Sequence, residues 1–480
     1  MDDRGSCERH AFRNASESVA SWQVVVALLV LAAAVASVRL PATADAPPPA
    51  PPLSLGEIIH TALKHNPQVA AARYDVDTAL RNVDVNRGQS LPVLSITGDY
   101  EYLPRRAIIG PLVMTPQIMV PTYTGGVVGL GLSIPLYTGG RIPLHVHVSD
   151  LGVLTAQHRL DATEQDLIFN LSSLYYSTLR LDAAVRATKK SAQSLESARA
   201  VVSEFFTVGK EPRVDVLRVE ARLADVSAQL VGLENARAVT LESVATLMGF
   251  AADTPIDVAG VDDALATALP EQLDIPSLFA QALQRRPEYL AMLSEERAQE
   301  DRVQLARAAY RPNVSFTAEY GVQSAGDIPS GGSVNEGVGQ VMLSTRFPIF
   351  DQTVHEHIRQ EESALAATRS RLAQTRLSVE LDVQKAAVAV RDTAAQVSAA
   401  EAGLAQADEA LRIEHLKLKV GKGVITDVLQ AQADSLQAQL GYQAALASHR
   451  IALVQLQRAS GALEPPQAPH VPASRPARDL

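Results

Sequence analysis

Residues 91–100 read LPVLSITGDY, and residues 311–320 repeat them as RPNVSFTAEY in a chain of 480 residues. The offset between the copies is 312 − 92 = 220 residues, and Asn66-Pro67 and Arg286-Pro287 precede them at the same offset, 287 − 67 = 220. In both copies apolar and polar residues alternate, which is the period of a β-strand with two unlike faces. The chain therefore builds one architecture twice, and each half contains strands.

A second pair of copies lies farther along the chain. The segment VGK at 208–210, followed by DVL at 215–217, returns as VGK at 420–422 followed by DVL at 427–429, at an offset of 427 − 215 = 212 residues. This period is far above the ~20–50 residues of solenoid repeats, so the duplicated unit is a whole domain. We assign the first repeat to residues 55–268 and the second repeat to residues 269–463.

The N-terminus has the features of a secretory signal peptide. Arginines precede an apolar run over residues 22–38, and ATA at 42–44 forms a cleavage site. We expect residues 1–44 to be removed, together with Cys7, the single cysteine. The mature chain would then have no thiol, as suits an oxidising compartment. The alternative is an uncleaved anchor, for which the run is short compared with the ~20 residues of a membrane span.

Composition limits the class of protein. Aromatic residues are only 4% of the chain and charged residues 20%, which fits long helices packed at narrow seams. The net charge of −10 and the lack of any basic run argue against a nucleic-acid partner. Residues 45–54 read as a Pro/Ala linker, and we expect the Pro-rich tail at 464–480 to be disordered.

Each half contains two candidate strands that we expect to pair as a β-hairpin, over about 93–137 and about 313–349. Loops rich in Gly and Pro, at 103–125 and 324–337, separate the strands of each pair. Alternating segments of about ten residues are typical of the strands of membrane barrels. A soluble hairpin with one wet face would show the same alternation.

The remainder of each half predicts long helices. Residues 151–208 and 352–420 contain no proline, and apolar residues recur there every seven positions. Sustained heptads indicate packing against other helices along their length. Such helices would be roughly 85–100 Å long at the usual rise. Return helices should follow at 214–248 and 425–459. The heptad positions are Leu160, Leu167, Leu174 and Leu181 in the first segment, and Val383, Val390, Val397, Leu404, Leu411 and Leu418 in the second.

Four strands in one chain cannot close a membrane barrel, because about eight is the smallest number known. An open sheet in lipid would leave unpaired backbone groups at its edges, and each such group is costly. If these strands cross a membrane, several chains must therefore share one barrel. The long helices that follow the strands would then form a shared bundle.

With these features the chain resembles the TolC family of outer-membrane efflux factors, over about residues 55–463. The resemblance is carried by the duplication, by the two turns with VG and DVL, and by the joints between helices and strands. Each motif is weak alone, but all of them in order, and twice, are specific. The joints are Pro92 and Pro312 before the strands, SIPLYTGGR at 133–141 with Pro135, and FPIFD at 347–351 with Pro348.

The resemblance implies a mixed α and β membrane protein that forms a homotrimer. Three chains with four strands each would build one 12-stranded β-barrel, continued by a long periplasmic coiled-coil barrel of α-helices. Family members are outer-membrane exit ducts of tripartite efflux or type I secretion systems in Gram-negative bacteria. They act with a periplasmic adaptor and an inner-membrane transporter, and they export drugs, metals, small molecules or proteins.

The two turns should form the tip of the helical tunnel. Glycine at 209 and at 421 ends a long helix, as expected of a residue that tolerates positive φ. The resemblance implies that an adaptor hairpin engages this tip, with Gly209, Lys210, Gly421 and Gly423 as the contact residues.

Asp215, Asp427 and Lys422 are the candidate residues of the pore constriction. A carboxylate at a helix start can simply stabilise the positive end of the helix dipole. Three symmetry-related carboxylates would instead form a ring that favours cations. Two positions depart from the family pattern: Gly423 stands where a latching arginine is found, and Gln430 stands where a second acid is found.

Other classes of function have little support. The chain lacks a nucleophile elbow, a P-loop, paired cysteines and an HExxH motif, so we expect neither an enzyme nor a cofactor. His145 and His147 recur as His355 and His357 and could suggest metal ligands, but i,i+2 side chains do not share a helix face. A secreted coiled-coil scaffold or adhesion stalk is the alternative, although it leaves the four strands unexplained.

Overall fold

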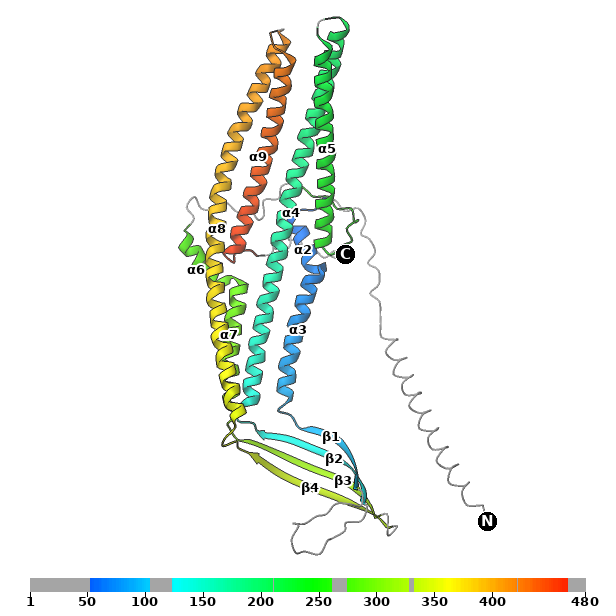
Figure 1. Cartoon of the computed structure of the whole chain (residues 1–480), viewed down its shortest axis with the longest axis vertical. Helices are drawn as coiled ribbons and strands as arrows, with labels where there is room; N and C mark the ends of the chain where they lie inside the picture. Colours follow the sequence, from blue (N-terminus) through cyan, green and yellow to red (C-terminus); the bar gives the residue numbers. More distant parts are fainter. Residues whose placement is uncertain are drawn as a thin grey trace, which may run out of the picture. The chain divides into compact units, whose positions relative to one another are not determined.

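Figure 1 shows the computed structural model of the chain, which describes residues 52–103, 123–209, 211–260, 274–327, 332–420 and 422–464. The expected signal peptide, most of the expected linker and nearly all of the expected tail lie outside these residues. So do Lys210 and Gly421.

Both halves contain the same succession of two helices, two strands and two further helices. The first half consists of α2 (Leu55–His65), α3 (Pro67–Gly88), β1 (Val93–Leu103), β2 (Tyr123–Tyr137), α4 (Arg141–Thr207) and α5 (Arg213–Leu247). The second half consists of α6 (Ile275–Arg285), α7 (Pro287–Ala308), β3 (Asn313–Asp327), β4 (Gly332–Arg346), α8 (Gln352–Lys419) and α9 (Ile425–Ala459).

The first long helix begins earlier than the proline-free segment suggests. α4 starts at Arg141, ten residues before position 151, and includes Pro143. This proline lies in the first helical turn, where a backbone N–H would have no intrahelical partner, so the missing donor costs nothing there. The expectation of a start near 151 was therefore too late.

α4 and α8 contain 67 and 68 residues, and each is about 100 Å long at ~1.5 Å per residue. α3 and α7 lie beside the halves nearest the sheet, and the return helices α5 and α9 lie beside the other halves (Figure 1). α4 contacts α3 and α7 at one level and α5 and α9 at the other. Among the described helices, none combines the length and apolar character needed to cross a membrane.

The helices are held together by apolar clusters at their seams. Ile58, Ile168, Tyr175 and Met248 are almost fully buried where α2, α4 and the end of α5 meet. Farther from the sheet, α4, α5 and α9 share a second cluster built around Leu195. Several of the predicted heptad positions are buried in these seams, as helix-to-helix packing requires: Leu167, Leu181, Val383 and Val390.

The four strands form one antiparallel sheet in the order β1-β2-β3-β4. Ile96 pairs with Leu130, and Leu130 pairs with Tyr320, so the two hairpins lie side by side. The second loop is shorter than expected, because β3 runs to Asp327 and β4 starts at Gly332. The Gly- and Ser-rich residues that read as a loop instead continue the ladder, since each has a partner on the opposite strand.

Candidate functional site

One face of the sheet is apolar and exposed. Leu94, Ile96, Tyr320 and Val341 are 72%, 78%, 69% and 72% exposed. The register places Ile96, Leu130 and Tyr320 side by side across three strands, so the exposed side chains form a continuous band. An exposed apolar surface of this kind marks a region that contacts a membrane or another protein.

The opposite face is polar. Ser95, Thr97 and Asp99 alternate with the apolar residues of β1, as the period of a strand requires. Across the sheet, Gln340 on β4 donates a hydrogen bond of 2.7 Å to Glu319 on β3. The sheet is therefore amphipathic, with a face suited to water and a face suited to an apolar medium.

Both edges of this sheet are open within the described chain. β1 and β4 each have one neighbouring strand, so the outward backbone groups of the 11 residues of β1 and the 15 residues of β4 find no ladder partner. Long open edges next to an apolar face are a template for pairing with another chain.

The four prolines predicted at the joints lie at strand ends. Pro92 and Pro312 immediately precede β1 and β3, and Pro348 follows the end of β4 by two positions. Pro135 lies inside β2, where the pairing with β3 shifts register between Pro135 and Tyr137. Such an irregularity suits proline, which has no N–H to donate to the ladder.

The two strand-to-helix joints are held by the segment that leads into β3. Arg311 donates a hydrogen bond of 3.1 Å to the carbonyl of Gly139, which has a φ of 65° at the start of α4. At the start of α8, Asp351 accepts a hydrogen bond of 2.9 Å from the N–H of Thr353, and the hydroxyl of Tyr310 donates to the Asp351 carbonyl at 3.0 Å. The long helices are therefore anchored to the sheet at neighbouring points.

At the far end of α4, the helix closes on Gly209. Its φ is 74°, a left-handed value that side chains other than glycine adopt only with strain. The N–H of Gly209 donates to the carbonyl of Phe206 at 3.0 Å. A Cβ at this position would meet no heavy atom within 4 Å, so the backbone angle alone requires glycine.

The second tip uses its glycine differently. The N–H groups of Lys422 and Gly423 both donate to the carbonyl of Lys417, at 2.9 and 3.0 Å. A Cβ on Gly423 would lie 2.7 Å from the backbone nitrogen of Leu418, so any side chain there would displace the turn. The absence of the family's arginine at this position therefore has a steric reason, while Lys422 beside it is exposed.

Asp215 lies at the start of α5 and is 6% exposed. Its carboxylate pairs with Arg218 at 3.0 Å, and the same guanidinium nitrogen donates to the hydroxyl of Thr426 at 3.1 Å. Since Thr426 lies at the start of α9, Arg218 connects the two helical hairpins at their tips.

Asp427 follows Thr426 and is exposed. No hydrogen bond or ion pair to its carboxylate occurs within the part of the chain that the structure describes. The pKa of Lys417 is raised, first by its hydrogen bond to Glu414 and in smaller part by the charge of Asp427. Gln430, at the position of a second family acid, donates to Asp434 at 2.9 Å. The structure thus separates a partnered Asp215 from a solvent-facing Asp427.

Sequence analysis missed Arg218. An arginine three residues after an aspartate on a helix is a signal for the pair with Asp215. No sequence signal predicts the bond to Thr426, which lies 208 residues away.

The repeated histidines are not brought together as a metal site. His147 lies 2.6 Å from the carboxylate of Asp301, and His357 lies 3.4 Å from the side-chain oxygen of Gln360. In the described segments no group of three or more His, Cys, Asp or Glu side chains is placed to hold a metal ion.

Comparisons with known proteins agree on one family. The profile described as "Outer membrane efflux protein" matches residues 58–250 and 278–462. The chain is 23% identical over 415 residues to Protein CyaE of Bordetella pertussis, covering 85% of each chain. It is 26% identical over 414 residues to Outer membrane protein TolC of Vibrio cholerae, covering 85% of this chain and 91% of the relative. The crystal structure of the outer membrane protein VceC from Vibrio cholerae is similar with a TM-score of 0.69 and 17% identity, over 85% of this chain and 96% of that chain.

Proposed function

We propose that this chain, which belongs to the outer membrane efflux protein family, is the outer-membrane exit duct of a tripartite efflux or type I secretion system. The duct is passive: it conducts cargo from the periplasm to the outside and catalyses no reaction. The family match and the shared fold of outer-membrane channels support this function. The feature that carries it is a four-stranded sheet with an exposed apolar face, joined directly to helices of 67 and 68 residues.

Three copies of the sheet, joined edge to edge, would close a barrel of 3 × 4 = 12 strands. Closure pairs β4 of one chain with β1 of the next, which satisfies the backbone groups that each chain leaves open. The face with Ile96 and Val341 would contact lipid, while the face with Glu319 and Gln340 would line a water-filled lumen. A homotrimer follows from this arrangement.

The helices would continue the barrel as a tunnel through the periplasm. Residues 1–44 would direct the chain across the inner membrane before removal. At the far end, the turns with Gly209, Lys210, Gly421 and Gly423 would engage a periplasmic adaptor, which connects the duct to an inner-membrane transporter. A polar hollow of about 350 Å³ between α4, α8 and α9, with Lys190 and Arg412 in its wall, offers hydrogen-bonding groups to such a helical partner.

The narrowest point would lie at the tips. Asp427 is the acid best suited to a constriction ring, because its carboxylate is exposed at the start of α9. Asp215 suits this role less well, since Arg218 engages its charge. Lys422, exposed one turn before Asp427, would moderate the negative potential of the ring.

Cell fractionation with cross-linking tests this function. The protein should remain in the outer membrane after a salt wash, dissolve only in detergent, and give a three-chain species on cross-linking. A coiled-coil scaffold or adhesion stalk would leave in the salt wash. A stable monomer inserted in the membrane would rule out the shared barrel.

A further inference from the structure

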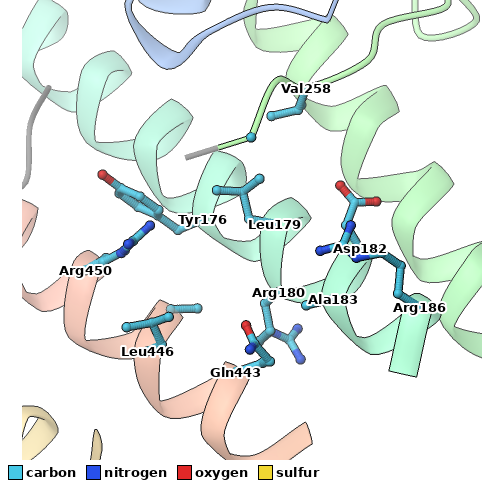
Figure 2. Close-up of a pocket in the computed structure, with 12 residues that line it drawn as sticks. Tyr176, Leu179, Arg180, Asp182, Ala183, Arg186, Val258, Gln443, Leu446 and Arg450 are labelled. Atoms are coloured by element: carbon cyan, nitrogen blue, oxygen red, sulfur yellow. The ribbon is translucent and has the colours of Figure 1, made fainter. Parts of the chain in front are cut away.

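A cavity of about 190 Å³ lies between α4 and α9, far from the sheet and apart from the tips. Arg180 and Arg186 of α4 and Arg450 of α9 all contribute to its wall (Figure 2). The segment that follows α5 closes one side with Val258 and Gly260. Three guanidinium groups thus line one small space in a chain whose net charge is −10.

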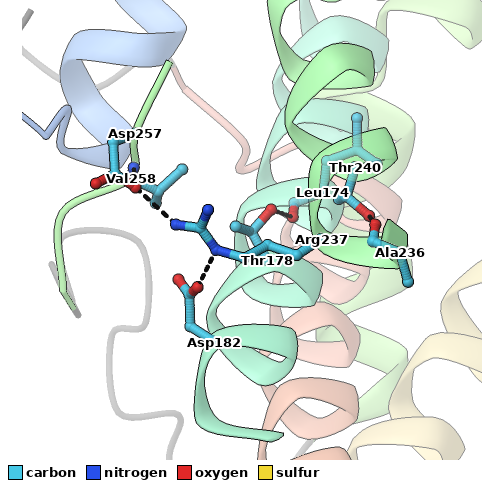
Figure 3. A network of polar contacts seen from close by, with 8 residues as sticks. All are labelled: Leu174, Thr178, Asp182, Ala236, Arg237, Thr240, Asp257 and Val258. Carbon is cyan, nitrogen blue, oxygen red and sulfur yellow. Dashed lines mark hydrogen bonds and ion pairs between the residues drawn. The ribbon is translucent and has the colours of Figure 1, made fainter. Parts of the chain in front are cut away.

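Asp182 is the one carboxylate among the residues that line this cavity, and its charge is already engaged. Arg237 of α5 ion-pairs with Asp182 and also with Asp257, at 2.8 Å in the second case (Figure 3). The hydrogen bond to Asp182 is the first cause of the raised pKa of Arg237. Asp182 therefore does not neutralise the arginines of the cavity.

The cavity arginines are otherwise without acids. Among the described residues, no carboxylate lies within ion-pairing distance of Arg180 or Arg186. The guanidinium of Arg450 lies over the ring of Tyr176, 5.7 Å from its centroid, which orients this side chain. Like charges that share a partly buried site repel one another, so a bound anion would stabilise the arrangement.

The chemistry of the wall selects the kind of anion. Guanidinium groups bind phosphate through paired, charge-assisted hydrogen bonds, and the side-chain amide of Gln443 adds a neutral donor. The volume equals that of roughly six water molecules at ~30 Å³ each, which suits an ion of the size of phosphate or pyrophosphate.

The source of the anion follows from distance along α4. Arg180 lies 180 − 141 = 39 residues from the first residue of this helix at the sheet, which is about 58 Å at ~1.5 Å per residue. A bilayer with its headgroups is only ~40–45 Å thick in total. Headgroups of a membrane around the sheet would therefore not reach this cavity, and the ligand must be water-soluble.

We propose that the cavity between α4 and α9 binds a small, soluble, multivalent oxyanion of the phosphate class. The bound ion connects Arg180 and Arg186, from the first repeat, to Arg450, from the second repeat. It acts as a removable cross-link between two helices that otherwise meet through small apolar contacts. This binding does not depend on the channel function.

Isothermal titration of the purified full-length protein in detergent, with inorganic pyrophosphate as the probe, tests the proposal. We expect saturable binding of one ion per chain that weakens with added salt. Arg180→Gln and Arg450→Gln should each weaken it by more than about tenfold, because a charge-assisted hydrogen bond is removed. Arg199→Gln, a matched change at an exposed position of the same helix, should leave binding unchanged.

A second readout is thermal unfolding followed by circular dichroism. Pyrophosphate should raise the midpoint for the wild type and for Arg199→Gln, but not for the double variant Arg180→Gln/Arg450→Gln. Arg180→Lys keeps the charge and should retain part of the shift, which excludes misfolding as the cause. The proposal is overturned if no saturable binding occurs, or if the cavity variants bind as tightly as Arg199→Gln does.

Discussion

Arg218 on α5 donates a hydrogen bond of 3.1 Å to the hydroxyl of Thr426 on α9, while the same nitrogen pairs with Asp215 at 3.0 Å. These two helices come from different repeats and contact one another over few residues. The tips of the two hairpins are therefore held together by a polar link from a side chain that is half exposed. Such links are weak individually and sensitive to salt, so they can open without unfolding the helices.

Removal of this link should loosen the tip. Arg218→Gln leaves Asp215 without its partner and removes the bond to Thr426, so we expect larger single-channel conductance in planar bilayers. The matched change Arg222→Gln, one turn farther along α5, should behave as the wild type. Equal conductance of the two variants would show that Arg218 does not hold the tip.

Asp427 should control the passage of cations. Asp427→Asn keeps the size of the side chain but removes its charge, so the trimer should lose much of its cation preference. Block by multivalent cations from the periplasmic side should weaken as well. Asp434→Asn, which changes charge two turns farther along α9, serves as the control. An unchanged block in Asp427→Asn would indicate that this residue only stabilises the helix start.

Gly209 should be intolerant of substitution because of its backbone angle. A side chain at φ 74° costs ~1–2 kcal/mol, although no neighbouring atom would be struck. We expect bulky residues at both Gly209 and Gly421 to abolish export, as measured by cargo release, while the trimer and its membrane insertion remain intact. Gly232→Val, in the middle of α5 with equally open surroundings, is the control. Normal export by the double variant would contradict the assignment of these turns.

His449 on α9 predicts a dependence of stability on pH. Its pKa is lowered from 6.5, first by burial and then by the charge of Arg450. Between the lowered pKa and 6.5 the unfolded chain binds a proton that the folded chain does not, so stability is complete above pH 6.5 and falls as the pH falls below it. His449→Gln should reduce the loss of thermal midpoint between pH 7.5 and 5.5. Equal losses in both proteins would exclude this residue as the cause.

Much of the secondary structure could be predicted because it is local. Alternation located the four strands, and proline-free heptads located α4 and α8. Two boundaries were wrong for physical reasons: Pro143 is tolerated in the first turn of α4, and the Gly-rich residues around 324–337 find ladder partners that a linear reading does not reveal.

The contacts of the site were less predictable, because they join distant parts of the chain. The bond between Arg218 and Thr426 spans 208 residues, and the cavity arginines come from positions in both repeats. The steric need for Gly423 also depends on how tightly the turn folds onto Leu418. A sequence gives the residue types at these places, but it does not give the distances between them.

Conductance in planar lipid bilayers is the most direct test of the central claim that this chain is an outer-membrane duct. Protein extracted from the outer membrane in detergent, and shown to be trimeric by cross-linking, should insert with uniform conductance steps. The same sample dissociated by heat should give none. A trimer without conductance, or conductance by a single chain, would contradict the account.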